Sequence, residues 1–277
     1  MAYGDGLYGD GLYGGAPLSA VVQNVFPPRV LVSLVGLVAD SIETVTIYRI
    51  VGTTRTELRG AIDLDTTGVD AVVRVDGETP FGIEIQYVAV MVDISGQVFE
   101  VYSPLLTVDV AADYVISDAI NALGVKVVVE TWPDRKRTRE STTFNVNGRL
   151  VAVSKPRSSP TATVSVRTDT ESDRDSLNDV LDAATSGVVL IRNNVGATGF
   201  DSYLAITDDT ENRQWWGPRT WFALETAEVD PWAPSLEARG FTLGDIATTY
   251  EGGVLSDISD DFNGQTLLAI AQAEFTG

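Results

Sequence analysis

Short segments with the pattern of β-strands recur at regular spacing between residues 17 and 110, and helical periodicity is absent there. In residues 45–50 and 83–87 apolar and polar side chains alternate, so that one face of each strand would lie in a core and the other in water. The predicted strands are 30–38, 44–50, 69–75, 83–93 and 105–110, with turns at Asp76-Gly77 and Ser95-Gly96. We therefore predict an antiparallel β-sandwich over residues 17–112.

The order of these segments resembles that of immunoglobulin and fibronectin type III modules. A proline-rich start leads into a long apolar strand, which is followed by a strand with Tyr48, a strand with Tyr87 and a closing strand after Ser103-Pro104. The resemblance implies a sandwich of two antiparallel sheets.

A second β-rich domain is predicted over residues 113–240, with a connector at residues 111–124 at its start. Its strands are expected at 125–131, 142–146, 149–153, 161–169, 188–192, 202–207 and 219–228, and residues 230–234 close it. The dipeptide Asn147-Gly148 joins two of these strands and is the strongest short-range signal for a hairpin.

One helix is predicted inside the second domain, over residues 172–186. Ser172 is a suitable N-cap, two aspartates lie in the first turn, and Gly187 follows the last turn. The residues at i, i+3, i+4 and i+7 form one apolar face, and they are Leu177, Val180, Leu181 and Ala184. The predicted fold is mainly β, with the first sandwich followed by a β-sandwich or split barrel that one helix crosses.

The N-terminal arm, residues 1–16, repeats the pentapeptide YGDGL and cannot build a core of its own. Glycine loses the most backbone freedom on ordering, and the few Tyr and Leu side chains bury too little area to compensate. The arm is therefore either a disordered terminus or a segment that docks on a partner, and we expect docking. The side chains expected to dock are Tyr3, Leu7, Tyr8, Leu12 and Tyr13.

The C-terminal tail, residues 241–277, contains a repeat with a spacing of twelve residues. Each copy places its apolar residues on one face of a two-turn helix, and helices this short are marginal in water without a partner. They either cap their own chain or dock on another subunit. The expected contact residues are Leu243, Ile246, Tyr250, Leu255, Ile258 and Phe262.

The amino-acid composition excludes many kinds of catalytic and metal-binding sites. The chain has neither cysteine nor histidine, which excludes disulfides, thiolate nucleophiles, imidazole bases and nearly all transition-metal sites. Carboxylate-pair catalysis and calcium binding remain chemically possible. Because no motif indicates either, we predict a protein that is not an enzyme and has no cofactor. The longest apolar stretch, residues 30–39, is too short for a membrane-spanning helix.

The formal net charge is −20 and is unevenly distributed. Residues 1–112 carry 5 basic and 14 acidic side chains, residues 113–240 carry 14 and 19, and residues 241–277 carry 0 and 6. This field repels phosphate backbones, so we expect no nucleic-acid partner. One basic run interrupts it, and it is predicted either to face an acidic neighbour or to be a solvated hairpin tip: Arg135, Lys136, Arg137 and Arg139.

Three side-chain clusters are candidate sites. The tryptophans Trp215, Trp216 and Trp221, beside Arg213 and Arg219, either stack a sugar or pack within a hairpin. The carboxylates Asp63, Asp65 and Asp70 are spaced somewhat like a calcium loop, but Arg74 occupies the place of the closing Glu. The carboxylates Asp208, Asp209 and Glu211 are expected in a solvated turn rather than as a catalytic pair.

Several segments between residues 120 and 255 carry a family resemblance: PTATVSVRT at 160–168 with the acidic helix after it, then VVLIR, YLAI and WFAL, and EVDPW at 228–232 followed by FTLGDIATTY at 241–250. Through these segments residues 120–255 resemble the minor tail proteins of long-tailed bacteriophages of actinobacteria. The closing repeat departs from that family, since Thr and Asp stand at many places where Ala is usual.

This resemblance implies a structural virion component of the tail tip, assembled in the host cytoplasm and held by other tail proteins and by copies of itself in a ring or trimer. It also implies a tail-tube or distal-tail type of β domain. The alternative function is a host-surface or glycan-binding module displayed on the tail.

Overall fold

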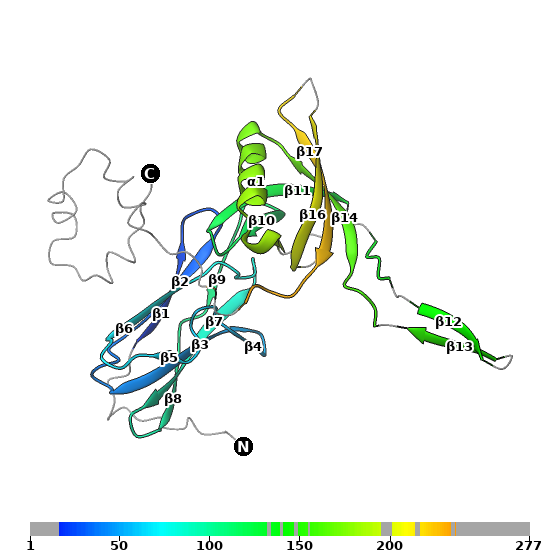
Figure 1. Cartoon of the computed structure of the whole chain (residues 1–277). Helices are drawn as coiled ribbons and strands as arrows, with labels where there is room; N and C mark the ends of the chain where they lie inside the picture. The colour runs from blue at the N-terminus through cyan, green and yellow to red at the C-terminus, as the bar shows by residue number, and fades with distance from the viewer. Residues whose placement is uncertain are drawn as a thin grey trace, which may run out of the picture.

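The computed structural model describes residues 17–131, 134–138, 141–146, 149–154, 156–194, 201–213, 217–233 and 236 (Figure 1). Within these residues the chain is mainly β, with several antiparallel sheets and one α-helix. The predicted fold class is therefore confirmed.

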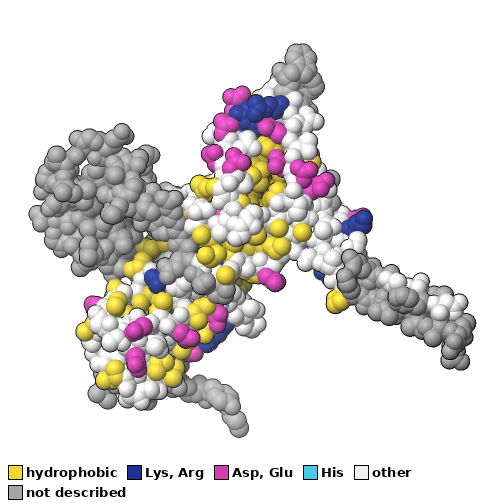
Figure 2. All heavy atoms as spheres, in the orientation of Figure 1, with side chains coloured by type: hydrophobic (Ala, Val, Ile, Leu, Met, Phe, Trp, Pro, Cys, Tyr) yellow, Lys and Arg dark blue, Asp and Glu magenta, His cyan; other side chains and the backbone are white. Residues whose placement is uncertain are grey.

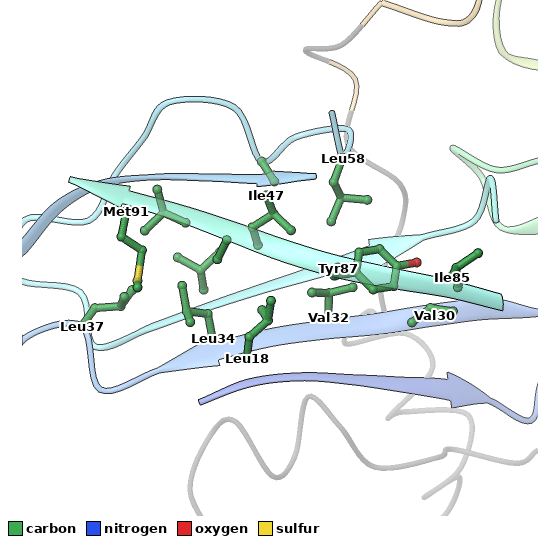
Figure 3. Packing of buried hydrophobic residues seen from close by; sticks show 14 of the residues in the cluster. Leu18, Val30, Val32, Leu34, Leu37, Ile47, Leu58, Ile85, Tyr87 and Met91 are labelled. Carbon is green, nitrogen blue, oxygen red and sulfur yellow. The ribbon is translucent and has the colours of Figure 1, made fainter. Parts of the chain in front are cut away.

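Residues 17–112 form two sheets packed face to face. The first sheet has the order β1 (Leu18–Gln23), β2 (Arg29–Val35), β6 (Ala71–Asp76). The second has the order β4 (Thr54–Glu57), β3 (Ile42–Val51), β7 (Glu84–Asp93), β8 (Val98–Tyr102), with the short strands β5 (Leu64–Asp65) beside β3 and β9 (Leu106–Thr107) beside β7. Val30, Val32 and Leu34 of β2 meet Ile47 of β3 and Tyr87 of β7 between the sheets (Figure 3). We call this unit the sandwich.

The alternation predicted for these strands is only partly correct. Ile85 and Tyr87 are buried in the core while Gln86 is half-exposed, as expected. From Val88 onward, however, the outward positions of β7 are also valines. The predicted strand at 105–110 is reduced to β9, and β1, β4, β5 and β8 had not been predicted.

The second unit is a closed six-stranded barrel. Its strands are β10 (Tyr114–Asp118), β11 (Leu123–Thr131), β14 (Thr161–Thr168), β17 (Thr220–Glu228), β16 (Ser202–Arg213) and β15 (Val188–Asn193), in that order around the barrel. The helix α1 (Glu171–Ala183) packs Leu177 and Val180 into the barrel core, as their spacing predicted. We call this unit the barrel.

The predicted connector at 111–124 is wrong, because most of it belongs to the barrel. All five residues of β10 are buried, and the strand pairs with β11 on one side and β15 on the other. A strand covered on both faces shows no alternation, which hid it in the sequence. The segment after it is a tight turn, with Ala122 at φ 57°, and leads directly into β11.

The N-cap of the helix lies two residues before the predicted one. Thr170 is the N-cap, and its hydroxyl accepts a hydrogen bond from the backbone N–H of Asp173 at 3.0 Å. Ser172 therefore lies in the first turn. The helix ends at Ala183, and the remainder of the predicted range is a 3-10 turn, Thr185–Gly187.

Candidate interaction surfaces

A two-stranded ribbon leaves the barrel between β11 and β14. Lys136 and Thr161 exchange two backbone hydrogen bonds of 2.8 and 2.9 Å, and Thr138 and Ser158 are bonded beyond them. The ribbon then continues as the hairpin β12 (Ser141–Val146) and β13 (Arg149–Ser154), which confirms the predicted hairpin. In Figure 1 it projects away from both the sandwich and the barrel. Arg135, Lys136 and Arg137 thus lie at the ribbon's stem, where Arg135 pairs with the acidic Glu228, so the alternative of a hairpin tip is wrong for these three residues, and Arg139 lies outside the described residues.

The hairpin stands without a third strand among the described residues. A two-stranded hairpin alone is at best marginally stable in water. Its register places two different sets of residues on its two faces, because neighbouring positions alternate. One face carries Thr142, Phe144, Val146, Arg149, Val151 and Val153, and the other carries Ser141, Thr143, Asn145, Leu150, Ala152 and Ser154. The first set, which we call the hairpin's apolar face, is the more hydrophobic.

The segment that contains this ribbon, residues 132–160, is basic in a chain that is acidic as a whole. Residues 132–160 contain 7 basic and 2 acidic side chains in a protein whose net charge is −20. Lys136, Arg137 and Arg157 in this segment are exposed, while Arg135 pairs with Glu228 of β17. The projecting part of the molecule is therefore its cationic part.

The second sheet of the sandwich is apolar on its outward side as well. Register and core packing turn Ile85, Tyr87, Ala89 and Met91 inward, so the alternate positions face outward. The outward apolar residues that are at least partly exposed are Tyr48, Ile50, Val90, Val92, Val98 and Tyr102, while Val88 between them is buried. Val98 is 61% exposed and Tyr102 is 45% exposed. We call this the outer sheet face, and strands that are apolar on both sides are typical of sheets covered on both sides.

Carboxylates are interspersed with these apolar residues. The outward positions also hold Asp65, Glu57, Glu84 and Glu100, and the outward cation is Arg55. Arg55 reaches from β4 to Glu100 at 2.9 Å and to the Tyr102 hydroxyl at 3.0 Å, both on β8. The hydrogen bond from Arg55 lowers the pKa of Glu100, so this carboxyl is ionised at neutral pH. The outer sheet face is thus apolar and anionic.

The sandwich and the barrel meet across a buried polar junction, and a cluster of sandwich residues around Asp76 borders it, close enough for its charge to act on Arg192 of the barrel. Asp76, at the end of β6, accepts hydrogen bonds from Arg49 at 2.8 and 2.9 Å, from the Tyr87 hydroxyl at 2.9 Å and from the Glu78 N–H at 2.9 Å. Burial, followed by the charge of Asp76, raises the pKa of Tyr87 well above its usual value. Burial alone would lower the pKa of Arg49, but Asp76 outweighs it and the pKa is raised. Arg49 and Asp76 therefore form a buried ion pair.

A second part of the junction joins the sandwich to residues behind β17. Arg59 pairs with Glu78 at 2.9 Å and donates to the backbone carbonyls of Trp232 and Ala233. Trp232 is buried and donates from its ring nitrogen to the carbonyl of Thr185 at 3.1 Å. These contacts tie the end of the described chain to both units.

The third part is Arg192 of β15, which is fully buried. Its guanidinium donates to the Thr79 carbonyl at 3.0 Å and to the Ser117 hydroxyl at 3.2 Å, and it lies 4.3 Å from the centre of the Phe81 ring. Burial lowers the pKa of Arg192 to about 10, against the attraction of Asp201. At neutral pH Arg192 is therefore a buried cation. It belongs to the barrel, and the Thr79 carbonyl and the Phe81 ring of the sandwich contact it.

A cleft of about 400 Å³ lies where the chain passes from the sandwich to the barrel. Its charged residues neutralise one another, since Lys126 lies 3.9 Å from Asp173 and Arg167 lies 3.0 Å from Asp169. Acidic and basic side chains gather in Figure 2 around one end of α1. The described residues contain no group of three acidic side chains placed to hold a metal ion.

The residues predicted to dock on partners lie outside the described residues. They are Tyr3, Leu7, Tyr8, Leu12 and Tyr13 of the arm, and Leu243, Ile246, Tyr250, Leu255, Ile258 and Phe262 of the tail. Trp215 and Trp216 lie outside them too, while Trp221 is half-buried in β17.

The carboxylate clusters are engaged in local hydrogen bonds. Asp63 accepts from the Thr46 hydroxyl at 3.2 Å, Asp65 from the Thr67 N–H and Asp70 from the Val38 N–H. The second cluster was misplaced in the prediction. Its three members, Asp208, Asp209 and Glu211, are exposed in β16 after a register shift and do not lie in a turn.

Comparison with known protein families and with curated proteins finds no match to this chain. No helix in the described part of the chain has the length and apolar character that crossing a membrane requires. The two surfaces that sequence reasoning missed had detectable signals: the run VAVMV in β7 lacks alternation, and residues 132–160 are cationic in an anionic chain.

Proposed function

We propose that this protein is a non-enzymatic assembly subunit, of the bacteriophage minor tail protein type that residues 120–255 resemble. It would act in the virion by docking on other tail proteins and on copies of itself. The observation that carries the proposal is the projecting hairpin β12–β13, which has no third strand beside it among the described residues. Such a ribbon gains stability from a surface supplied by another subunit.

The sandwich supports the same proposal. With β1, β2 and β6 in one sheet and β3, β7 and β8 in the other, its strand order is compatible with an immunoglobulin or fibronectin III type of module. The buried contacts of Arg59 with the Trp232 carbonyl and of Arg192 with the Thr79 carbonyl join sandwich and barrel, and they are suited to a subunit that must keep its surfaces in fixed relative positions.

The test is to replace residues 141–154 by a short Gly-Ser turn and to measure folding and assembly separately. We expect unchanged far-UV circular dichroism and melting of the body, and loss of incorporation when the variant is the only source of this subunit during phage growth. A matched control carries Thr143→Ser and Asn145→Ser on the hairpin's other face, and this variant should be incorporated into tails normally.

Normal tails from the hairpin-deleted chain would contradict the proposal. Adhesion of the purified protein to host envelopes, with no incorporation into tails, would instead favour a host-surface or glycan-binding module.

A further inference from the structure

We propose that the C-terminal tail covers the outward side of the first sheet of its own sandwich, and that the first copy of its repeat makes the contact. The inference goes beyond the proposed function, because it concerns contacts within one chain and holds whether or not the protein assembles into phage tails. It selects one of the two docking sites that the sequence left open for this segment.

Strand register separates the two sides of the first sheet, which consists of β1, β2 and β6. Val30, Val32 and Leu34 of β2 point into the sandwich core (Figure 3). The alternate residues and their register partners therefore point outward. We call these outward residues the β2 face: Ser19, Val21, Gln23, Arg29, Leu31, Ser33, Val35, Ala71, Val73 and Val75.

The middle of the β2 face is buried. Leu31 is 4% exposed, Ser33 is 3% exposed and Val75 is 8% exposed. Leu31 and Val75 nevertheless belong to none of the three buried apolar clusters in the described part of the chain, and the helix α1 packs on strands of the barrel. Val21, the register partner of Leu31, is 56% exposed, as expected for a side chain on an open sheet. The burial of Leu31 and Val75 thus requires a cover that the described residues do not supply.

The polar side chains of the β2 face indicate that the cover is a peptide with acidic residues. Gln23 is 3% exposed, and no described residue hydrogen-bonds its side-chain amide. A buried amide needs both a donor and an acceptor, which a peptide backbone supplies together. Arg29 is the charged residue of the face and is 7% exposed, and none of the outward residues is acidic. The C-terminal tail has the complementary charge, since residues 241–277 hold six acidic and no basic side chains.

The described chain ends beside this face. Leu236, the last described residue, packs against the cluster that contains Ala119. Ala119 in turn lies against Gly77, where an added Cβ would be 3.0 Å from the Ala119 Cβ. Gly77 follows the last residue of β6 and is two positions after Val75. The C-terminal tail therefore starts close to the buried part of the face, and the stretch from Leu236 to Leu243 can span up to about 25 Å.

The first copy of the repeat supplies the apolar side of the contact. Leu243, Ile246 and Tyr250 fall on one face of a two-turn helix. A helix this short is marginal in water alone. Leu31 and Val75 offer it an apolar surface, so that both surfaces exchange water for apolar contact.

The N-terminal arm also lies outside the described residues, but it joins the sheet at the wrong end. It leads into β1 at Leu18, which pairs with Leu34. The buried residues Gln23 and Arg29 pair at the opposite end of the same two strands. The position of the face therefore favours the C-terminal tail over the arm.

The absence of cysteine from the sequence allows a test by thiol labelling of the full chain. The single cysteine of Leu31→Cys should react slowly with a maleimide, because the C-terminal tail covers it. Adding Leu243→Asp and Ile246→Asp should speed the reaction by about tenfold or more, because a charged segment no longer holds the apolar face closed. The matched tail variant, Thr248→Ser with Thr249→Ser, should leave the reaction slow.

Two reference cysteines separate loss of the cover from loss of folding. Val21→Cys on the same face should react fast with both the wild-type and the altered C-terminal tail, and Val32→Cys in the core should react slowly with both. An equal acceleration at Val32→Cys would overturn the proposal, because the C-terminal tail would then hold the whole sandwich together. If Leu31→Cys lowers the melting temperature, Ser33→Cys repeats the measurement with a nearly isosteric change on the same face.

Three results would contradict the proposal. One is unchanged labelling of Leu31→Cys in the altered C-terminal tail. Another is faster labelling caused by Tyr8→Ser with Tyr13→Ser, which would make the N-terminal arm the cover. The third is loss of protection on about hundredfold dilution, which would mean that the cover comes from another copy, whereas protection that persists on dilution supports a cover within the chain.

Discussion

Removing the carboxylate of Asp76 should be among the most damaging single changes in the described part of the chain. Asp76 has a side chain 1% exposed and accepts from Arg49, from the Tyr87 hydroxyl and from the Glu78 N–H. In Asp76→Ala the guanidinium of Arg49 keeps its charge but loses its anion. Breaking a buried pair in this way costs about 3–5 kcal/mol, because an uncompensated charge stays buried.

The loss of stability in Asp76→Ala has a second contribution, and a double variant tests whether the unpaired charge causes the first. The Tyr87 hydroxyl loses its acceptor in the same variant, which adds about 1 kcal/mol. The double variant Arg49→Met with Asp76→Ala removes both charges and should recover about 1–3 kcal/mol relative to Asp76→Ala alone. For a protein of this size the single change, about 4–6 kcal/mol in all, corresponds to a fall of about 8–24 °C in melting temperature.

The assay is urea unfolding followed by tryptophan fluorescence and circular dichroism, with Asp209→Ala on the exposed part of β16 as the control. The control should unfold at the wild-type urea concentration. A loss below about 1 kcal/mol for Asp76→Ala, or a double variant no more stable than Asp76→Ala alone, would refute the reasoning that the junction depends on charge pairing.

Three further outcomes are expected. Gly124→Ala should destabilise the protein by about 1–3 kcal/mol, because the new Cβ would lie 2.7 Å from Pro27 Cβ, whereas Gly217→Ala, with nothing within 4 Å, should unfold as the wild type does. Thr170→Ala should lower the free energy of unfolding by about 1 kcal/mol, because it removes the helix N-cap. Thr170→Ser should retain most of the wild-type stability in the same urea assay. Burial and the adjacent carboxylate raise the pKa of Tyr87, so its stabilising contribution is complete below pH 10, the usual tyrosine value, and is lost as pH rises above it. Urea midpoints measured from pH 8 to 11 should therefore fall more steeply for the wild type than for Tyr87→Phe, and equal slopes would contradict this assignment.

The elements that local rules specify were predictable from the sequence. The hairpin at Asn147-Gly148 and the buried face of the helix at Leu177 and Val180 follow from turn preference and from a period of 3.6 residues. Both depend on residues within one element. The sandwich class was predictable for the same reason, because alternation marks parts of its strands, such as residues 45–50 and 83–87.

What could not be predicted depends on contacts between distant segments. The strand β10 has no alternation because both of its faces are covered, with Tyr114 and Ile116 in the barrel core and Val115 in the sandwich core, and a local pattern cannot distinguish it from a linker. Arg192 is ordinary in sequence, yet its surroundings come from Thr79 and Phe81, more than one hundred positions away. The outer sheet face likewise emerges only when the register aligns β3, β7 and β8.

The way the ribbon leaves the barrel has a mechanical consequence. It follows β11 and β14, which are neighbours in the closed barrel, so a pull along the hairpin reaches the barrel through the isolated bridge of Lys136 and Thr161. Under such a load the bonds of a ladder are sheared together and do not open one after another. The narrowest point is the stem, where the backbone bonds at Lys136 and Thr161 join hairpin and barrel. The subunit would resist tension along its own projection and would yield first to torsion at that stem.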